Sequence, residues 1–157
     1  MTAKIEHILV PTDGSEHALK AAAFAGDLAR AMKARVSLLV VHEDDVIVAS
    51  AWGAGINPAG SPRDTMSVDE VRTQLERQSR DKELPATVTA LGELQADPAL
   101  EIAWGNTADE ICRFASEQQV NLIVVGSHGR TGIRRAFLGS VSQAVANQAP
   151  CPVTIVR

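Results

Sequence analysis

The sequence predicts an α/β protein built on a doubly wound parallel sheet. Short apolar runs alternate with Ala-rich or amphipathic segments along the chain, and strands that alternate with helices form parallel sheets. The run at 122–125 is continuously apolar and the run at 36–41 is apolar apart from Ser37, which is typical of strands covered on both faces. With 157 residues, of which 45% are hydrophobic, the chain suits one domain, 1–157, with a sizeable core.

The elements follow from hydrophobic period and turn residues. The expected strands are 5–10, 36–41, 99–104, 121–125 and 153–156. The expected helices are 15–32, 67–83, one that begins at 107, and 140–148. Strand one, its helix and strand two form a right-handed βαβ unit. Segment 85–97 fits either a short helix, 87–95, or a strand, and 43–66 has no periodicity and predicts a long mobile loop.

Several helix starts carry capping signals. Ser67 with Glu70, and Thr107 with Glu110, have the spacing of a capping box. Asp13 with Glu16 has the same spacing, but Asp13 also follows strand one, at the edge where open α/β sheets bind ligands. Asp13 is therefore either a helix cap or a ligand-binding carboxylate, and Ser15 is the alternative cap.

The segment 121–147 combines the features of an anion site. A buried strand leads into a loop with glycines at 126, 129, 132 and 139, and a helix begins at Ser140. Glycine lets backbone approach a ligand, and the first N–H groups of a helix have no internal partner and favour an anion. Arg130, Arg134 and Arg135 add positive charge. Neither a P-loop nor a G-x-G-x-x-G dinucleotide fingerprint is present.

The spacing Gly126-x2-Gly129-x9-Gly139-Ser140 resembles the nucleotide-binding motif of the universal stress protein family. The resemblance extends to ILVPTDGSEHALKAA at 8–22, which looks like the family's opening, and to APCPVTIVR at 149–157, which looks like its close. Only 43–98 carries no clear resemblance. Three matching blocks in the right order point to a single-domain member of the ATP-binding type.

The resemblance implies a Rossmann-like fold, an open, mostly parallel sheet with five strands and helices on both faces, in which strand one lies beside strand four. It also implies the ligand, ATP or another adenine nucleotide, with Mg²⁺ or Mn²⁺ held through the phosphates. The nucleoside end would meet Pro11, Thr12, Asp13, Val41 and Gly126, and the phosphate end would meet Gly129, Arg130, Gly139, Ser140, Val141 and Ser142. Ser127, in the same loop, is a further nucleotide-binding candidate. His128 either touches phosphate or is a loop histidine without function.

Three functions fit these expectations. The first is a nucleotide-binding stress-response regulator whose ATP occupancy changes its conformation or its partners. The second is a slow ATPase or self-phosphorylating enzyme, although no P-loop lysine and no obvious base for water accompany the phosphate loop. The third is a protein-interaction module without a ligand, against which the intact glycine motif argues. We favour the regulator, with an unidentified protein partner.

Composition and charge limit which partners the protein can bind and in which cell compartment it is expected. The net charge of −4 argues against a nucleic-acid-binding surface, and no apolar run is long enough to span a membrane. The first residues contain no apolar signal region, so we expect a cytoplasmic protein. Cys112 and Cys151 are expected to be reduced and buried, and the histidines have no metal-ligand spacing. The apolar strand 153–156 predicts a sheet edge, which is a template for pairing with another chain, and the family resemblance implies a homodimer there.

Overall fold

The computed structural model describes residues 4–44, 67–130 and 138–157. Its centre is a sheet of five strands in the order β3-β2-β1-β4-β5, and all neighbouring strands are parallel. The strands are β1 (His7–Pro11), β2 (Arg35–His42), β3 (Ala99–Trp104), β4 (Leu122–Gly126) and β5 (Val153–Val156). The expected Rossmann-like, doubly wound sheet is therefore confirmed, and it is parallel throughout the described residues.

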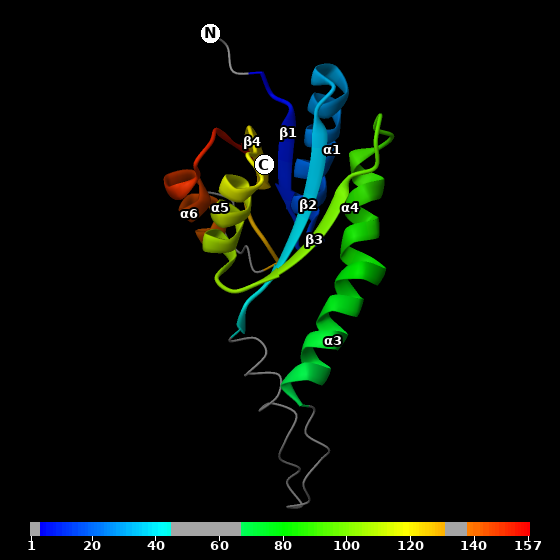
Figure 1. The fold of residues 1–157 in the computed structure, drawn as a ribbon, viewed down its shortest axis with the longest axis vertical. Helices are drawn as coiled ribbons and strands as arrows, with labels where there is room; N and C mark the ends of the chain where they lie inside the picture. The colour runs from blue at the N-terminus through cyan, green and yellow to red at the C-terminus, as the bar shows by residue number, and fades with distance from the viewer. Residues whose placement is uncertain (1–3, 45–66, 131–137) are drawn as a thin grey trace, which may run out of the picture.

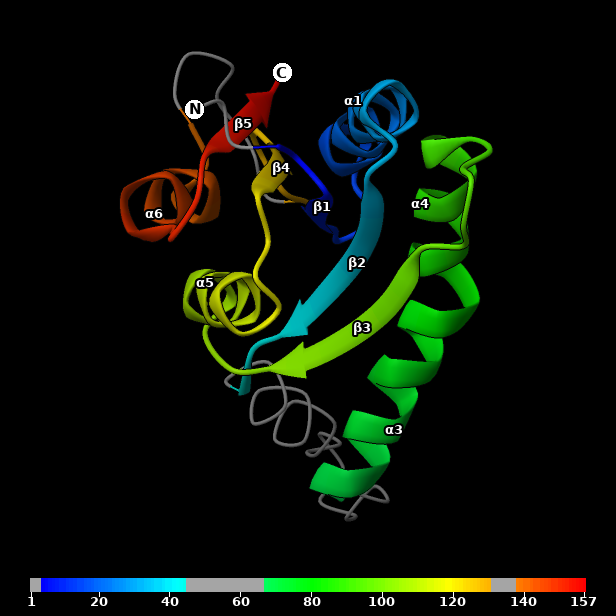
Figure 2. The same cartoon turned by 45° about the horizontal axis from the view of Figure 1, so that its top comes forward.

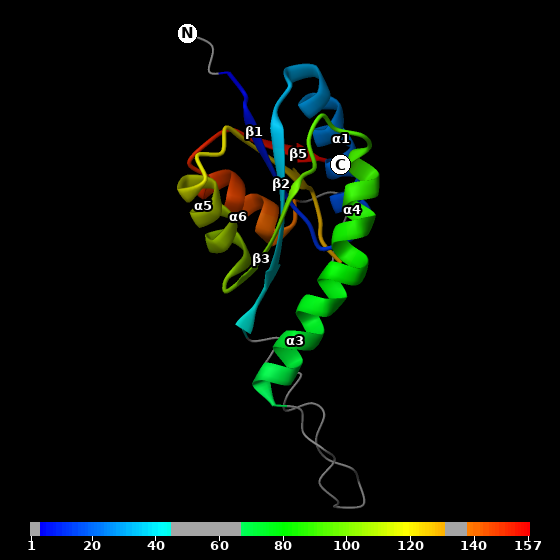
Figure 3. The ribbon, with the colours of Figure 1, turned by 45° about the vertical axis from the view of Figure 1, so that its right-hand side comes forward.

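Helices cover both faces of the sheet (Figures 1 and 2). One face carries α1 (Glu16–Met32) and a long helical rod made of α3 (Val68–Gln78), the π-helical turn η1 (Ser79–Glu83) and α4 (Leu84–Leu91). The other face carries α5 (Thr107–Glu117) and α6 (Ser140–Gln148). Figure 3 shows α3 continuing beyond the carboxyl ends of β2 and β3.

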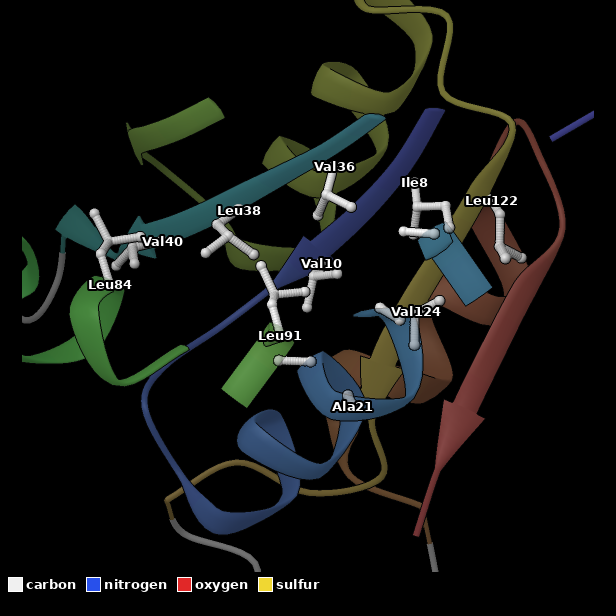
Figure 4. Packing of buried hydrophobic residues seen from close by; sticks show 13 residues of the cluster. Ile8, Val10, Ala21, Val36, Leu38, Val40, Leu84, Leu91, Leu122 and Val124 are labelled. Atoms are coloured by element: carbon white, nitrogen blue, oxygen red, sulfur yellow. The ribbon is translucent and has the colours of Figure 1, made fainter. Parts of the chain in front are cut away.

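Two apolar clusters hold these layers together. Successive strand residues point to opposite faces, so Ile8 and Val10 enter one cluster while Leu9 enters the other. The first cluster packs the alanines of α1 and the leucines of α4 against β1 and β2 (Figure 4). The second joins β1, β2 and β4 to α5 and α6. Continuous apolar runs are needed because each central strand is buried on both sides.

Strand β1 lies in the middle of the sheet. Ile8 is opposite Val36 of β2 on one side and Leu122 of β4 on the other. The adjacency of strands one and four, which the family resemblance implied, is confirmed. It brings the turn after β1 next to the loop after β4. Strand β5 is a sheet edge, as expected, because β4 is its one neighbour in the sheet order.

The caps agree with the sequence at α3, match the alternative that the sequence offered at α1, and differ at α5. Ser67 and Glu70 form the complete capping box of α3. At α1 the cap is Ser15, whose hydroxyl accepts from the N–H of Ala18, so the helix-cap interpretation of Asp13 is wrong. At α5 the cap is Asn106 rather than Thr107, because the amide oxygen of Asn106 accepts from the N–H of Asp109.

The segment 85–97 is helical only in its first part. The helix α4 begins at Leu84 and ends at Leu91, so the alternative of a strand is wrong. Pro85 looks like a break in sequence because it lacks an N–H group. The π-helical turn that precedes Pro85 accommodates the proline. The N–H of Leu84 donates to the carbonyl of Ser79, five residues back, and the helical rod continues through Pro85. The predicted loop 43–66 lies outside the described residues from position 45 onward.

The two cysteines are free but less buried than expected. Both side chains are half-buried, and burial raises the pKa of each thiol. The buried face of α5 is formed by Ala108, Ile111 and Ala115, and Cys112 is not part of it. The thiol of Cys112 lies beside the core, not inside it.

Gly26 is a position at which helix propensity and packing disagree. A Cβ atom there would lie 2.0 Å from the carbonyl oxygen of Leu91, a backbone atom that no rotamer change can move. We predict that Gly26→Ala lowers the free energy of unfolding by about 1–3 kcal/mol, measured by urea denaturation. Ala23→Gly, on the exposed face of the same helix, should cost about 1 kcal/mol through propensity alone. A stabilised Gly26→Ala variant would contradict this packing.

His7 makes stability depend on pH. Its Nδ1 lies 3.2 Å from the carbonyl oxygen of Gln118, which only accepts, so Nδ1 carries the proton and Nε2 accepts from Ser37 Oγ at 2.8 Å. Burial first, and then the charge of Arg35, lowers the pKa of His7 below its ordinary value of 6.5. The unfolded chain therefore binds the proton first as the pH falls.

We predict that stability is lost as the pH falls below about 6.5, and that His7→Gln makes this loss less steep. Burial also lowers the pKa of His42, so part of the dependence should persist in the variant. Urea denaturation of both proteins between pH 8 and pH 5.5 measures the two slopes, and equal slopes would show that His7 does not contribute.

Candidate functional site

A cavity of about 820 Å³ opens at the carboxyl ends of the central strands. All of the site residues expected from the sequence line it, except Ser127. The turn after β1 supplies Pro11, Thr12 and Asp13, and the segments on either side of 131–137 supply the glycines and the start of α6. The parallel sheet explains this convergence, because the carboxyl ends of its strands meet at one edge.

The N-terminus of α6 forms one wall of the cavity. The helix begins at Ser140, as expected, and the residue before it is Gly139, so no side chain caps this end. The N–H of Gly139 donates to the carbonyl of Ser127 at 2.7 Å, which fixes where the helix begins. Within the described residues, the N–H groups of Ser140, Val141 and Ser142 have no acceptor. Unpaired helix N–H groups of this kind favour an anion.

Two glycines are required by close packing. A Cβ atom on Gly129 would lie 2.8 Å from Asp13 Oδ2, and one on Gly139 would lie 3.0 Å from the carbonyl oxygen of Ser127. The loop after β4 therefore lies directly on the turn after β1, and the start of α6 lies directly on the loop. Larger residues at either position would open this arrangement.

Asp13 is held by backbone donors at the cavity wall. Its Oδ1 accepts from the N–H of Ser15 at 2.9 Å, and its Oδ2 accepts from the N–H of Arg130 at 3.0 Å. The carboxylate is thus fixed across both segments that form the site. Each oxygen retains a lone pair with which to accept from a ligand hydroxyl.

The hydroxyl groups near the loop are largely occupied. Ser142 Oγ is 2.9 Å from the carbonyl oxygen of Gly139 and 3.1 Å from that of Ser127, so it donates to protein. Ser127 is buried behind the cavity wall, with its Oγ 3.0 Å from Nδ1 of His128. Its N–H donates to the carbonyl of Val156 at 2.8 Å. Ser127 therefore anchors the loop, whereas the ring of His128 lines the cavity and lies 5.2 Å from that of His17.

Arg130 is directed onto the turn after β1. Its Nε donates to the carbonyl oxygen of Asp13 at 2.9 Å, and its guanidinium group also pairs with Glu83. Among the described residues that line the cavity, Arg130 is the one lysine or arginine. Arg134 and Arg135 lie outside the described residues.

The remaining lining of the cavity is mostly apolar and was only partly expected from the sequence. The lining residues that sequence reasoning missed are Ala18, Leu39, Glu43, Thr107, Ile111, Val125 and Leu138. Leu39 could have been found, since it is two residues before Val41 and so shares its face of β2. Glu43 and Thr107 meet only in the fold, where Thr107 Oγ1 donates to Glu43 Oε1 at 2.7 Å.

The described residues contain neither a metal cluster nor a membrane-spanning helix. Within 4–44, 67–130 and 138–157, no group of three His, Cys, Asp or Glu side chains is arranged to hold a metal ion. No helix in the same part of the chain combines the length and apolar content that crossing a bilayer requires.

Comparison with known proteins identifies the family. The sequence profile of the Universal stress protein family matches residues 4–157. The chain belongs to the universal stress protein family. Universal stress protein YxiE of Bacillus subtilis is 35% identical over 151 residues, which cover 96% of this chain and 97% of that protein.

Solved universal stress proteins share the fold. The structure of MJ0577, a universal stress protein of Methanocaldococcus jannaschii, superposes with a TM-score of 0.79 at 25% identity and covers 98% of this chain and 96% of its own. A universal stress protein in complex with cAMP superposes with a TM-score of 0.61 at 24% identity, covering 99% of this chain and 98% of its own. The α/β fold derived above is thus the fold of the family.

Proposed function

We propose that this universal stress protein is a stress-response regulator that binds ATP or another adenine nucleotide. The observation that carries the proposal is the cavity itself, whose lining combines apolar side chains with helix N–H groups that have no acceptor among the described residues. A ligand that combines a flat apolar ring with an anionic tail fits this division. The volume of about 820 Å³ lies within the usual range of small-molecule sites.

Each part of the nucleotide has a proposed place. The base would lie between Leu39, Val41, Ile111 and Val125, beside Pro11, Thr12 and Gly126. The ribose hydroxyls would donate to Asp13. The phosphates would lie against Gly129, Gly139 and the N–H groups of Ser140, Val141 and Ser142, with Arg130 and His128 at the side and Ser127 supporting the loop from behind.

The donors at the phosphate end are sufficient for useful affinity. Hydrogen bonds to a charged group contribute about 1.5–3 kcal/mol each, and micromolar binding needs about 8 kcal/mol in total. The N–H groups of α6 are already in place and have no protein acceptor to give up within the described residues. Little ordering is therefore required before they bind.

The related protein solved with cAMP is consistent with this ligand class. It shares the fold of this chain, although its 24% identity does not transfer its ligand. The case for an adenine nucleotide therefore depends on the residues of this cavity. A bound Mg²⁺ or Mn²⁺ would be held through the phosphates, since Mg²⁺ needs few protein ligands when phosphates supply the rest.

Regulation fits the site better than catalysis. Asp13 lies against the glycine loop, but both of its oxygens already accept backbone N–H groups. No lysine of the described chain lines the cavity to neutralise a transferred phosphoryl group. Slow hydrolysis or self-phosphorylation is the second candidate, because the hydroxyl of Ser140 adjoins the proposed phosphates.

The proposal includes a homodimer in the cytoplasm and an unidentified protein partner. Strand β5 offers an apolar edge, which is a template for pairing with a second copy. The two cysteines of the protein are free, which suits a reducing compartment such as the cytoplasm. A regulator also needs a partner that distinguishes its loaded and empty forms.

Two substitutions separate the ends of the ligand. Asp13→Ala removes the ribose contact and should weaken adenosine and ATP alike, by about tenfold. Gly139→Val should block the phosphates and abolish ATP binding, with a much smaller effect on adenosine, because its Cβ would press on the carbonyl of Ser127. Titration calorimetry measures both ligands, and circular dichroism checks the fold. Full ATP affinity in a natively folded Gly139→Val variant would remove the loop from the site.

The dimer is tested at Ile155. The carbonyls of Pro152 and Val156 accept from β4, and alternate residues of a parallel strand point their backbone groups to the same side. The N–H of Ile155 therefore points away from β4, toward the free edge. Ile155→Pro should yield monomers by light scattering while the β4–β5 pairing survives. A variant that keeps the dimeric mass would place the interface elsewhere.

A further inference from the structure

Glu83 is a buried carboxylate outside the cavity wall. It lies on the π-helical turn between α3 and α4, and its side chain is 7% exposed. A buried carboxylate is stable only when it is paired and hydrogen-bonded. Its Oε2 accepts from Ser79 Oγ at 2.8 Å, and its Oε1 pairs with the guanidinium of Arg130. The charge of Arg130 is thus held by a residue on the far side of the turn after β1.

Contacts of the helical rod hold Glu83 in place independently of Arg130. Ser79 is fully buried and lies 2.9 Å from Nε2 of His42 on β2. Thr87 Oγ1 donates to the carbonyl oxygen of Glu83 at 2.7 Å and lies 2.8 Å from Thr12 Oγ1 on the turn after β1. π-helical turns of this kind occur frequently at functional sites. The carboxylate is therefore a rigid anchor, supported from β2 and from the turn.

Arg130 joins three segments through one side chain and its own N–H. The N–H donates to Asp13 Oδ2, Nε donates to the carbonyl oxygen of Asp13, and the terminal nitrogen pairs with Glu83. The stem of Glu83 also packs on the same turn, since a Cβ on Gly14 would lie 3.2 Å from Glu83 Cγ. The loop after β4 is thereby held against the turn after β1.

Energetics favour a fixed arginine over one that swings to the ligand. If Arg130 left Glu83 for a phosphate, a nearly buried carboxylate would keep only the hydroxyl of Ser79, and an unpaired buried charge is strongly unfavourable. A guanidinium has five N–H donors in a rigid fork. Among the described residues, none accepts from Nη1 of Arg130, so the group can stay on Glu83 and still donate outward.

We propose that Glu83 is a positioning residue for phosphate recognition, which locks Arg130 across the turn after β1 and keeps the spare donors of its guanidinium at the cavity. The phosphate part of this inference rests on the proposed nucleotide function. The locking of Arg130 is a property of the protein without ligand and can be measured separately.

The decisive variant is Glu83→Gln, which keeps the size of the side chain and its contact with Ser79 but removes the charge. We expect the affinity for ATP to fall about tenfold, while the affinity for adenosine stays within about twofold. Glu76→Gln is the matched control, because Glu76 lies on α3 and accepts from Trp104 Nε1 rather than from Arg130. It removes the same charge from the same rod and should leave both affinities unchanged.

A double-mutant cycle tests whether Glu83 acts through Arg130. In an Arg130→Gln background, Glu83→Gln should have no further effect on ATP affinity. An equal tenfold loss in that background would overturn the proposal, as would tighter ATP binding by Glu83→Gln alone, which would mean that Glu83 competes with phosphate for Arg130. Thermal denaturation verifies that each variant is folded.

Amide exchange measured without nucleotide separates this inference from the proposed function. Glu83→Gln should accelerate hydrogen exchange at the N–H of Arg130, which donates to Asp13, while Glu76→Gln should not. If the unmodified protein binds no nucleotide, the proposed function fails, and the exchange rate alone decides whether Glu83 locks the loop. An unchanged rate in Glu83→Gln would overturn the locking role.

Discussion

The pairing of β1 with β4 in the middle of the sheet is the constraint on which the site depends. Ile8 lies opposite Leu122, so the two strands run side by side and their next segments leave the sheet at the same edge. Asp13 then reaches the N–H of Arg130 at 3.0 Å, although 117 residues separate them in sequence. Gly129 is needed because Asp13 Oδ2 occupies the space that a side chain would fill. Without this adjacency, the glycine loop would have no surface to fold against.

The chemistry of the cavity comes mainly from backbone groups that the fold holds in place. The bond from Gly139 to the carbonyl of Ser127 fixes the start of α6, and the N–H groups that follow have no protein acceptor in the described chain. Side chains mostly support this arrangement: Ser142 donates to carbonyls of the loop, and Arg130 is held by Glu83. A site of this kind is preorganised, so binding requires little rearrangement of the protein. That property suits a protein that registers whether a nucleotide is present.

Sequence reasoning succeeded where a signal is local. Continuous apolar runs predicted β1, β2 and β4, and the capping box at Ser67 predicted the start of α3. Glycine spacing marked the loop and the start of α6. It failed where two local signals compete: Asn106 rather than Thr107 caps α5, and a π-helical turn carries the rod through Pro85. Contacts between segments that are distant in sequence could not be predicted, because no local sequence pattern indicates them. Glu43 with Thr107, and Glu83 with Arg130, are joined only by the tertiary fold.

The central claim is that the N–H groups at the start of α6 bind the phosphates of an adenine nucleotide. The most direct measurement is a titration followed by the amide resonances of the isotopically labelled protein. ATP should shift the resonances of Ser140, Val141 and Ser142 together with those of Leu39 and Val41, whereas adenosine should shift only the second group. If ATP binds but leaves the amides of Ser140, Val141 and Ser142 unmoved, or if it shifts neither group, the account of this cavity is wrong.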